Sequence, residues 1–185
     1  MKTWETIGTQ RAIREFSDRK VKGDRIRRIL DAGRRAPSSM NEQRRAFIVV
    51  RDRDRLHQLA GVGAYSGHLA GAAFAVALIT PDIEEPWVRE SIAFDLGQAA
   101  QNMMLAAWDE GIGSCHAAVH DPLLAQQVLG YPDTHRCDYL LSFGYPKDGA
   151  AAEPKEKKKA GRIALEELRH EERWLPIGSE PTYQA

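Results

Sequence analysis

The sequence predicts a three-layer sandwich of α/β or α+β class, with helices on both faces of one mixed β-sheet. Three observations support this. Helical and extended segments alternate along the chain, one extended segment is almost wholly apolar, and 185 residues suit one domain with a sizeable core. A dinucleotide-binding Rossmann domain is disfavoured, because no predicted strand is followed by a G-x-G-x-x-G motif.

Two helices are predicted before the first strand. A short helix is expected at residues 4–10, with Thr3 as its N-cap. A longer helix at residues 23–36 repeats apolar residues with helical spacing. It should end before Pro37, because the residue that precedes a proline disfavours helical backbone.

Four extended segments are predicted to form the sheet. They are rich in apolar, β-branched or aromatic residues, and they span residues 46–50, 72–80, 112–119 and 139–144. The second segment is nearly continuous in apolar residues. We therefore expect it to be a central strand covered on both faces.

The remaining helices are predicted between the strands and after the last one. A short helix is expected at residues 52–59, and the longest helix at residues 86–110. The longest helix carries apolar residues on more than one stripe, so we expect burial on several sides, including a subunit interface. Asp121 should cap a helix at residues 122–130, and a last helix is expected at residues 163–174.

The C-terminal part of the chain differs in composition from the rest. Residues 147–161 are dominated by Lys, Glu, Ala and Gly, which is typical of a linker. The tail at residues 175–185 has no periodicity, and we expect it to reach toward a second subunit. We interpret residues 1–185 as one domain that includes this linker and tail.

Charge and cysteine content narrow the classes of partner. Lys and Arg total 26, as do Asp and Glu, so the formal net charge is zero and nucleic acid is not the expected partner. Cys115 and Cys137 are too widely spaced for a metal site or a disulfide framework, which favours a reducing compartment. The N-terminus lacks the layout of a signal peptide, and the longest apolar stretch is too short to span a bilayer. We expect a soluble cytoplasmic protein with no membrane partner and no metal.

An arginine-containing segment at residues 11–16 is the first candidate for binding. Arg11 and Arg14, which flank Ala12 and Ile13, keep their charge at any working pH and can bind a phosphate with two parallel hydrogen bonds. The alternative is a solvated surface with ion pairs at its rim.

A polar loop after the second predicted helix is the next candidate. It supplies hydroxyls and amides that suit the edge of a polar heterocycle, from Pro37, Ser38, Ser39, Asn41 and Gln43. The alternative is a polar turn that needs Pro, Ser and Asn for purely conformational reasons.

Four motifs in this order resemble the nitroreductase family of FMN-dependent, NAD(P)H-using oxidoreductases. They are residues 11–16, the loop at residues 37–43, the long helix with the Gly111-Ile112-Gly113-Ser114-Cys115 that follows it, and residues 162–174. The resemblance implies the α+β fold of that family, with a mixed sheet. It also implies a homodimer with two flavins at the interface, each site built from both chains.

The resemblance assigns expected roles to individual residues. Arg11, Ala12 and Arg14 would contact the FMN phosphate and the pyrimidine edge of the flavin, and the loop at residues 37–43 would bind flavin N3, O4 and O2. Backbone groups of Ala117, Ala118 and Val119 would face flavin N5 and O4, and Arg162 would bind the phosphate.

The reactive centre implied by the family is flavin N5, so no catalytic side chain is expected. NADH or NADPH would supply hydride, and the acceptor would be a nitroaromatic, a quinone or a related small molecule. The sequence contains no motif that separates NADH from NADPH or identifies the physiological acceptor.

This chain departs from the family pattern at both candidate segments. Gln10 and Ala12 stand where an arginine and a serine are frequent, so Arg162 is expected to supply the missing phosphate contact. Arg44 and Arg45 stand where the family commonly has Pro-Trp, and their charge would favour an anionic substrate or a phosphorylated nicotinamide.

The polar residues of the long helix are expected to be structural. Buried amides and carboxylates must be hydrogen-bonded. We therefore expect structural hydrogen bonds, in the core or at a dimer interface, for Asp95, Gln98, Gln101 and Asn102.

Two other functions remain compatible with the sequence. One is a specialised flavin enzyme of the same fold, such as a dehalogenase or a flavin-fragmenting enzyme. The other is a non-enzymatic module that binds an acidic partner through the Lys155–Lys159 segment and through Arg34, Arg35, Arg44 and Arg45.

Overall fold

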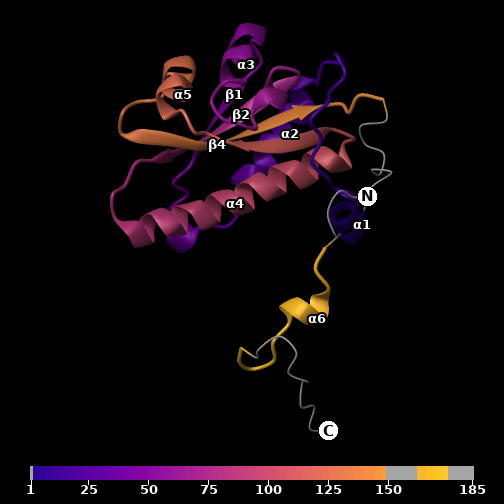
Figure 1. Cartoon of the computed structure of the whole chain (residues 1–185), viewed down its shortest axis with the longest axis vertical. Helices are drawn as coiled ribbons and strands as arrows, with labels where there is room; N and C mark the ends of the chain where they lie inside the picture. The colour runs from indigo at the N-terminus through magenta and orange to yellow at the C-terminus, as the bar shows by residue number, and fades with distance from the viewer. Residues whose placement is uncertain (1, 149–161, 175–185) are drawn as a thin grey trace. The chain divides into compact units, whose positions relative to one another are not determined.

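The computed structural model describes residues 2–148 and 162–174, and the chain divides into two units, Met1–Ala151 and Ala152–Ala185. The first unit holds the whole of the described sheet (Figure 1). Most of the predicted linker and the predicted tail lie outside the described residues. The expectation that residues 1–185 form one domain therefore stays a prediction.

Four strands form one sheet in the order β1-β2-β4-β3: β1 (Ala46–Val50), β2 (Phe74–Pro81), β3 (Gly113–Ala118) and β4 (His135–Gly144). All three strand pairs are antiparallel, so the four named strands form an antiparallel sheet where a mixed sheet was predicted. Among the described residues, parallel pairing is limited to an isolated bridge between Ala12 and Ser114. β2 is central, as its apolar sequence predicts, and β1 and β3 are the edge strands.

The helices are α1 (Thr3–Thr9), α2 (Gly23–Arg34), α3 (Arg53–Leu59), α4 (Pro86–Asp109), α5 (Pro122–Leu129) and α6 (Leu165–Leu168), with short 3₁₀ turns η1 (Ser39–Asn41) and η2 (Gly67–Leu69). Within the described part of the chain, no helix is both long and apolar enough to cross a membrane.

The first unit has three layers, which confirms the α+β sandwich. α3 and α5 cover one face of the sheet, and α2 and α4 cover the other (Figure 1). Because side chains alternate along a strand, β2 feeds both cores. Phe74, Val76 and Leu78 pack toward α2 and α4, whereas Ala75, Ala77 and Ile79 pack toward α3 and α5.

Several predicted boundaries are confirmed by cap contacts. Pro86 begins α4, and the Asp121 carboxylate accepts the Leu124 N–H over 3.0 Å at the start of α5. Gly130 ends α5 with a left-handed φ of 73°, the conformation that glycine adopts without strain.

Three predicted details differ from the structure. The N-cap of α1 is Lys2, and Thr3 lies inside the helix. β4 begins at His135 because residues 135–137 pair with the end of β2, although their polar composition does not resemble a strand. The predicted helix at residues 163–174 is only the four-residue α6, whose exposed residues lack the packing that stabilises a short helix.

Candidate functional site

The arginine-containing segment lies along the outer edge of β3. Ala12 forms a bridge with Ser114, and the N–H of Ile13 donates to the Ser114 carbonyl over 2.9 Å. Ile13 is buried and packs so closely on Gly113 that a Cβ at that glycine would lie 2.6 Å from an Ile13 side-chain carbon. The backbone of this segment is therefore fixed at the beginning of β3.

The two arginines of this segment keep their side chains outside the core. Arg14 is exposed, and Arg11 is half-buried with its Nε donating to the Thr9 carbonyl over 3.3 Å. Burial lowers the pKa of His68, and the nearby Arg14 charge lowers this pKa further. A permanent positive charge thus lies close to β3.

A buried histidine that sequence reasoning missed lies behind this strand. His68 Nδ1 is 2.8 Å from the Ser142 Oγ, and the Ser142 hydroxyl donates to the Cys115 carbonyl over 3.2 Å. The ring tautomer decides whether Nδ1 donates to or accepts from the Ser142 hydroxyl. Within the described part of the chain Nε2 has no hydrogen-bond partner. A lone histidine before an apolar strand has no spacing that would mark it as functional.

The end of β3 turns one of its three predicted N–H groups outward. The Val119 N–H donates to the Asp138 carbonyl over 2.9 Å. Because N–H directions alternate along an antiparallel strand, the Ala117 N–H also points toward β4, and the Ala118 N–H points to the open edge. The Ala118 carbonyl faces out as well, since a Cβ at Gly63 would lie 2.4 Å from its oxygen. The geometry narrows the expected backbone donor to Ala118.

Three segments therefore lie along one edge of the sheet. They are residues 11–14 at the beginning of β3, the loop around Gly63 and the end of β3, and we call this strand edge the β3 edge. It combines permanent positive charge, a backbone donor directed outward and a close approach that only glycine permits. This arrangement can bind an anionic group and the polar rim of a planar ligand.

The polar loop at residues 37–43 has a fixed shape but lies elsewhere. Its Ser39 N–H donates to the Asp95 carboxylate of α4 over 3.0 Å, and its Gln43 N–H donates to the Ser38 Oγ over 3.1 Å. Ser38 is half-buried, and Pro37, Ser39, Asn41 and Gln43 are exposed. The loop borders an open cavity of about 430 Å³ against α4.

The polar residues of α4 include two that are structural, as predicted. Asp95 accepts the loop hydrogen bond just described, and the Asn102 side chain donates to the Ala32 carbonyl of α2 over 3.4 Å. Both contacts join α4 to α2 or to the loop after it.

Arg44 and Arg45 do not present unpaired charge to this cavity. Arg44 forms an ion pair with Glu42 over 2.6 Å. Arg45 donates to three backbone carbonyls where the chain leaves α2, those of Arg34, Ala36 and Pro37. The expectation that these two arginines favour an anionic substrate therefore gains no support from their contacts.

One chain does not bring the loop and the β3 edge together. The loop leads into β1, which is the opposite edge strand of the sheet. Three strand spacings of about 4.8 Å each separate the two edges by roughly 14 Å, with the sheet between them. Arg162 lies in the second unit, where it is exposed before α6, and its expected role stays a prediction.

Fold and site together define an α+β protein whose β3 edge combines arginine charge with an outward backbone N–H. The profile described as the nitroreductase family matches residues 7–78 and 61–145. A protein of Archaeoglobus fulgidus, assigned as an NADH dehydrogenase/NAD(P)H nitroreductase, is 34% identical over 146 residues, which cover 77% of this chain and 84% of the relative.

Two further likenesses agree with this match. The NADPH-flavin oxidoreductase of Vibrio harveyi is 27% identical over 166 residues, covering 83% of this chain and 69% of that protein. The crystal structure of a nitroreductase family protein from Clostridium novyi superposes with a TM-score of 0.73 and 26% identity, covering 80% of this chain and 87% of that one. The chain belongs to the nitroreductase family, and it is an NAD(P)H-dependent oxidoreductase.

Proposed function

We propose that this oxidoreductase uses FMN to pass hydride from NADH or NADPH to a nitroaromatic, a quinone or a related small acceptor. The observation that carries the proposal is the β3 edge, along which the Arg14 charge lies near Cys115 and the Ala118 N–H is directed outward at the strand end. Family membership supports the nicotinamide donor, and the edge supports the choice of cofactor.

The residues of the β3 edge suit a flavin mononucleotide. The guanidinium groups of Arg11 and Arg14 supply charge for a phosphate or for the pyrimidine carbonyls. The missing Cβ of Gly63 lets its loop approach the Ala118 carbonyl oxygen closely, because a Cβ there would lie 2.4 Å from that oxygen. Phosphate, pyrimidine edge and N5 thus each have a donor of suitable chemistry.

The contribution of the protein is binding and electrostatics. A bound FMN supplies hydride transfer at its N5 atom. The Ala118 N–H would donate a hydrogen bond to the bound flavin and stabilise negative charge that develops on the flavin. This N–H is held in place by the β3–β4 ladder. The positive charge of Arg14 would stabilise the same developing negative charge. Because hydride transfer takes place at the flavin, this function needs no acid–base side chain.

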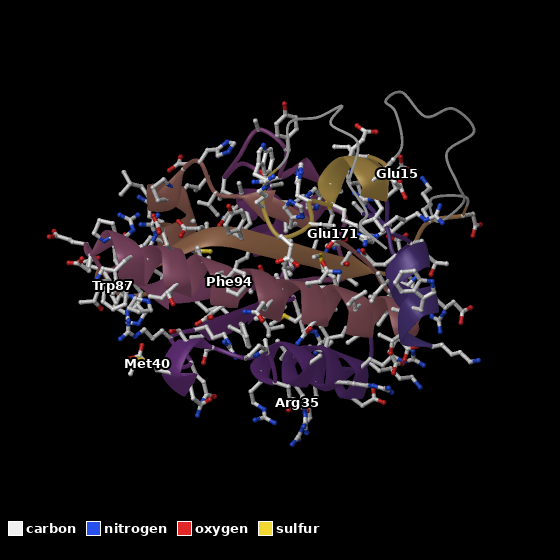
Figure 2. The ribbon with its side chains drawn as sticks, turned by 90° about the horizontal axis from the view of Figure 1, so that it is seen from below. Glu15, Arg35, Met40, Trp87, Phe94 and Glu171 are labelled. Carbon is white, nitrogen blue, oxygen red and sulfur yellow. The ribbon has the colours of Figure 1, made fainter. Side chains whose placement is uncertain are left out.

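We also propose a homodimer in which each site takes the loop at residues 37–43 from one copy and the β3 edge from the other. The placement of these two parts on opposite edges of the sheet supports this arrangement. α4 supports it as well, because Trp87 and Phe94 are 67% and 72% exposed in the single chain. Figure 2 shows both side chains on α4, with Met40 of the loop toward the same end. A second copy is the partner whose contacts would bury them.

The C-terminal unit is proposed to complete this site. Arg162 would supply the phosphate contact that Gln10 lacks. The described part of this unit exposes four large apolar residues, Ile163, Leu165, Leu168 and Trp174, which suit contact with another protein surface. The single-domain interpretation of the chain is part of this proposal.

A binding module for an acidic partner is less well supported. Arg35 and Arg34 both bind the Asp31 carboxylate over 2.7 Å and lower its pKa, and Arg44 is paired with Glu42. Asp31 and Glu42 offset two of the four arginine charges, and the guanidinium of Arg45 is already bound to backbone carbonyls. Their contacts therefore favour a structural role. We further propose a cytoplasmic location, since Cys115 and Cys137 are both free and buried.

The decisive experiment is the visible spectrum of the purified full-length protein, before and after incubation with FMN. We expect a flavin spectrum that NADH or NADPH bleaches without air, and that nitrofurazone restores. A colourless protein that gains no flavin would overturn the proposal. Bound flavin without nitrofurazone turnover would instead favour the specialised enzymes of the same fold.

A further inference from the structure

We propose that Arg45 is a positioning residue, which holds the loop at residues 37–43 in the shape needed to meet the cofactor. The inference rests on the proposed function, since it assumes that this loop contacts the flavin. Arg45 stands where an aromatic residue would otherwise be expected, and its contacts give it a role other than binding a substrate.

The loop adopts a backbone conformation that its own residues do not favour. Met40, Asn41 and Gln43 have φ angles of 51°, 57° and 52°, all in the left-handed region. Asparagine tolerates this region, but methionine and glutamine carry a side chain that crowds the backbone there, at about 1–2 kcal/mol per residue. Contacts from outside the loop must therefore hold it in place.

Arg45 makes such contacts where the loop begins. Its Nη2 donates to the Ala36 carbonyl over 2.5 Å and to the Arg34 carbonyl over 3.2 Å, and its Nη1 is 3.4 Å from the Pro37 carbonyl. Carbonyls at the end of a helix lack partners within the helix, and a glycine cap often supplies the turn that satisfies them. No glycine directly follows α2, whose C-cap is Arg35, and the Arg45 guanidinium binds the exposed carbonyls instead.

Asp95 holds the middle of the same loop. Its carboxylate accepts the Ser39 N–H from the side of α4, one residue before Met40. Arg45 and Asp95 thus act on the loop from two directions, and the left-handed residues follow both contacts. We expect the loss of either side chain to let the loop relax.

The geometry also explains why arginine is required. A planar guanidinium presents several N–H groups in a fixed fork, so one side chain can reach three carbonyls. A lysine ammonium at this position would carry the same charge but would reach fewer carbonyls in that geometry. A substrate would find these N–H groups already engaged.

The first experiment measures the loop directly and needs no flavin. Met40 is 88% exposed, so Met40→Cys accepts a spin label, while Cys115 and Cys137 are buried. We expect Arg45→Ala to make this label clearly more mobile, and Arg45→Lys to have an intermediate effect. Arg35→Ala is the matched control, because Arg35 ends the same helix but binds Asp31. Equal label mobility in Arg45→Ala and Arg35→Ala would overturn the proposal.

The second experiment measures flavin affinity in unlabelled protein. We expect Arg45→Ala to raise the Kd for FMN about tenfold, as for the loss of charged hydrogen bonds, and Arg45→Lys to recover part of that loss. The melting temperature of the apoprotein should fall only slightly, because Arg45 belongs to neither core cluster. A loss of flavin affinity fully accounted for by a lower melting temperature would show a general structural role and contradict the proposal.

Asp95 provides an independent variant if Arg45→Ala does not fold. Asp95→Ala removes the acceptor of the Ser39 N–H, whereas Asp95→Asn keeps an oxygen there. We expect the alanine variant to mobilise the label and the asparagine variant to leave it nearly unchanged. In the double variant Asp95→Ala, Arg45→Lys, the change in label mobility should differ from the sum of the two single changes, because both residues hold one loop. If wild-type protein binds no FMN, the proposed function fails while the label still tests the loop.

Discussion

Gly63 is the single residue whose replacement should affect the β3 edge most directly. In Gly63→Ala the new methyl group would lie 2.4 Å from the Ala118 carbonyl oxygen, so the peptide or the loop must move. We expect FMN affinity to fall about tenfold, since the displaced Ala118–Val119 peptide adjoins the Ala117–Ala118 peptide that carries the proposed donor N–H. Flavin fluorescence titration measures this change.

The matched control for this variant is Gly67→Ala. A Cβ at Gly67 meets no atom within 4 Å, so its affinity for FMN should stay close to wild type. Equal affinities in the two alanine variants would show that the Ala118 peptide does not contact the cofactor.

His68 should make stability fall in mild acid. Burial, followed by the Arg14 charge, lowers its pKa in the folded protein, whereas the unfolded chain binds a proton below about pH 6.5. The unfolded state then holds more protons, so the free energy of unfolding decreases as pH falls from about 6.5 toward the folded pKa. The slope from this one group is at most about 1.4 kcal/mol per pH unit.

Urea unfolding of His68→Phe between pH 7 and pH 5 tests this account. We expect a smaller loss of stability in acid than in the wild type, whatever the stability at pH 7. His57→Phe, on the exposed surface of α3, controls for the removal of a histidine as such. An unchanged slope in His68→Phe would mean that another group carries the pH dependence.

For single residues, the sequence predicted which side chains are charged but not which groups they contact. Arg11 and Arg14 both belong to the segment beside the beginning of β3, where Ile13 between them is buried. Arg44 and Arg45 have the same chemistry, yet one is paired with Glu42 and the other binds carbonyls. Those partners depend on where α2 ends in space, which local sequence does not encode.

At the scale of elements, strong local signals predicted the structure well. β1 spans residues 46–50 as expected, and the Asp121 cap and Gly130 end of α5 are both present. These signals are chemical, because an apolar β-branched run, a carboxylate acceptor and a left-handed glycine each act within a few residues.

Elements that depend on distant contacts were predicted less well. The polar start of β4 is a strand only because β2 pairs with it, and η1 depends on Asp95 of α4. α6 shows the reverse case, since periodic apolar residues without a packed surface form only one turn of helix.

The C-terminal unit supplies a prediction about its arginine. Arg162→Ala should weaken binding of FMN about tenfold but leave binding of riboflavin unchanged, because only FMN carries the phosphate. The melting temperature of the apoprotein should stay near wild type, since Arg162 is exposed. Equal losses for both flavins would contradict a phosphate contact.

At the scale of the whole molecule, the candidate site was predicted in parts but not in its arrangement. The residues proposed to bind phosphate and flavin were predicted from motifs, whereas their division between opposite edges follows from the strand order β1-β2-β4-β3. No local pattern specifies that order, because it results from the pairing of strands far apart in the chain.

The proposed dimer leads to a test on α4. Phe94→Glu places a charge on an exposed apolar surface beside the loop at residues 37–43. We expect it to shift the protein from dimer to monomer and to lower flavin content in parallel, as measured by light scattering and absorbance. Leu123→Glu, at a 70% exposed residue of α5 in the other layer, is the control. A dimer that tolerates Phe94→Glu would place the interface elsewhere.

The separation of the loop from the β3 edge has a genetic consequence. In the proposed assembly, a chain damaged at Arg14 still offers a sound loop, and a chain damaged at Gln43 still offers a sound strand end. Each such chain fails by itself. When the two variants are co-expressed in one cell, we expect activity to return. In a heterodimer one site combines the intact loop of the first chain with the intact strand end of the second, while both substitutions fall in the other site.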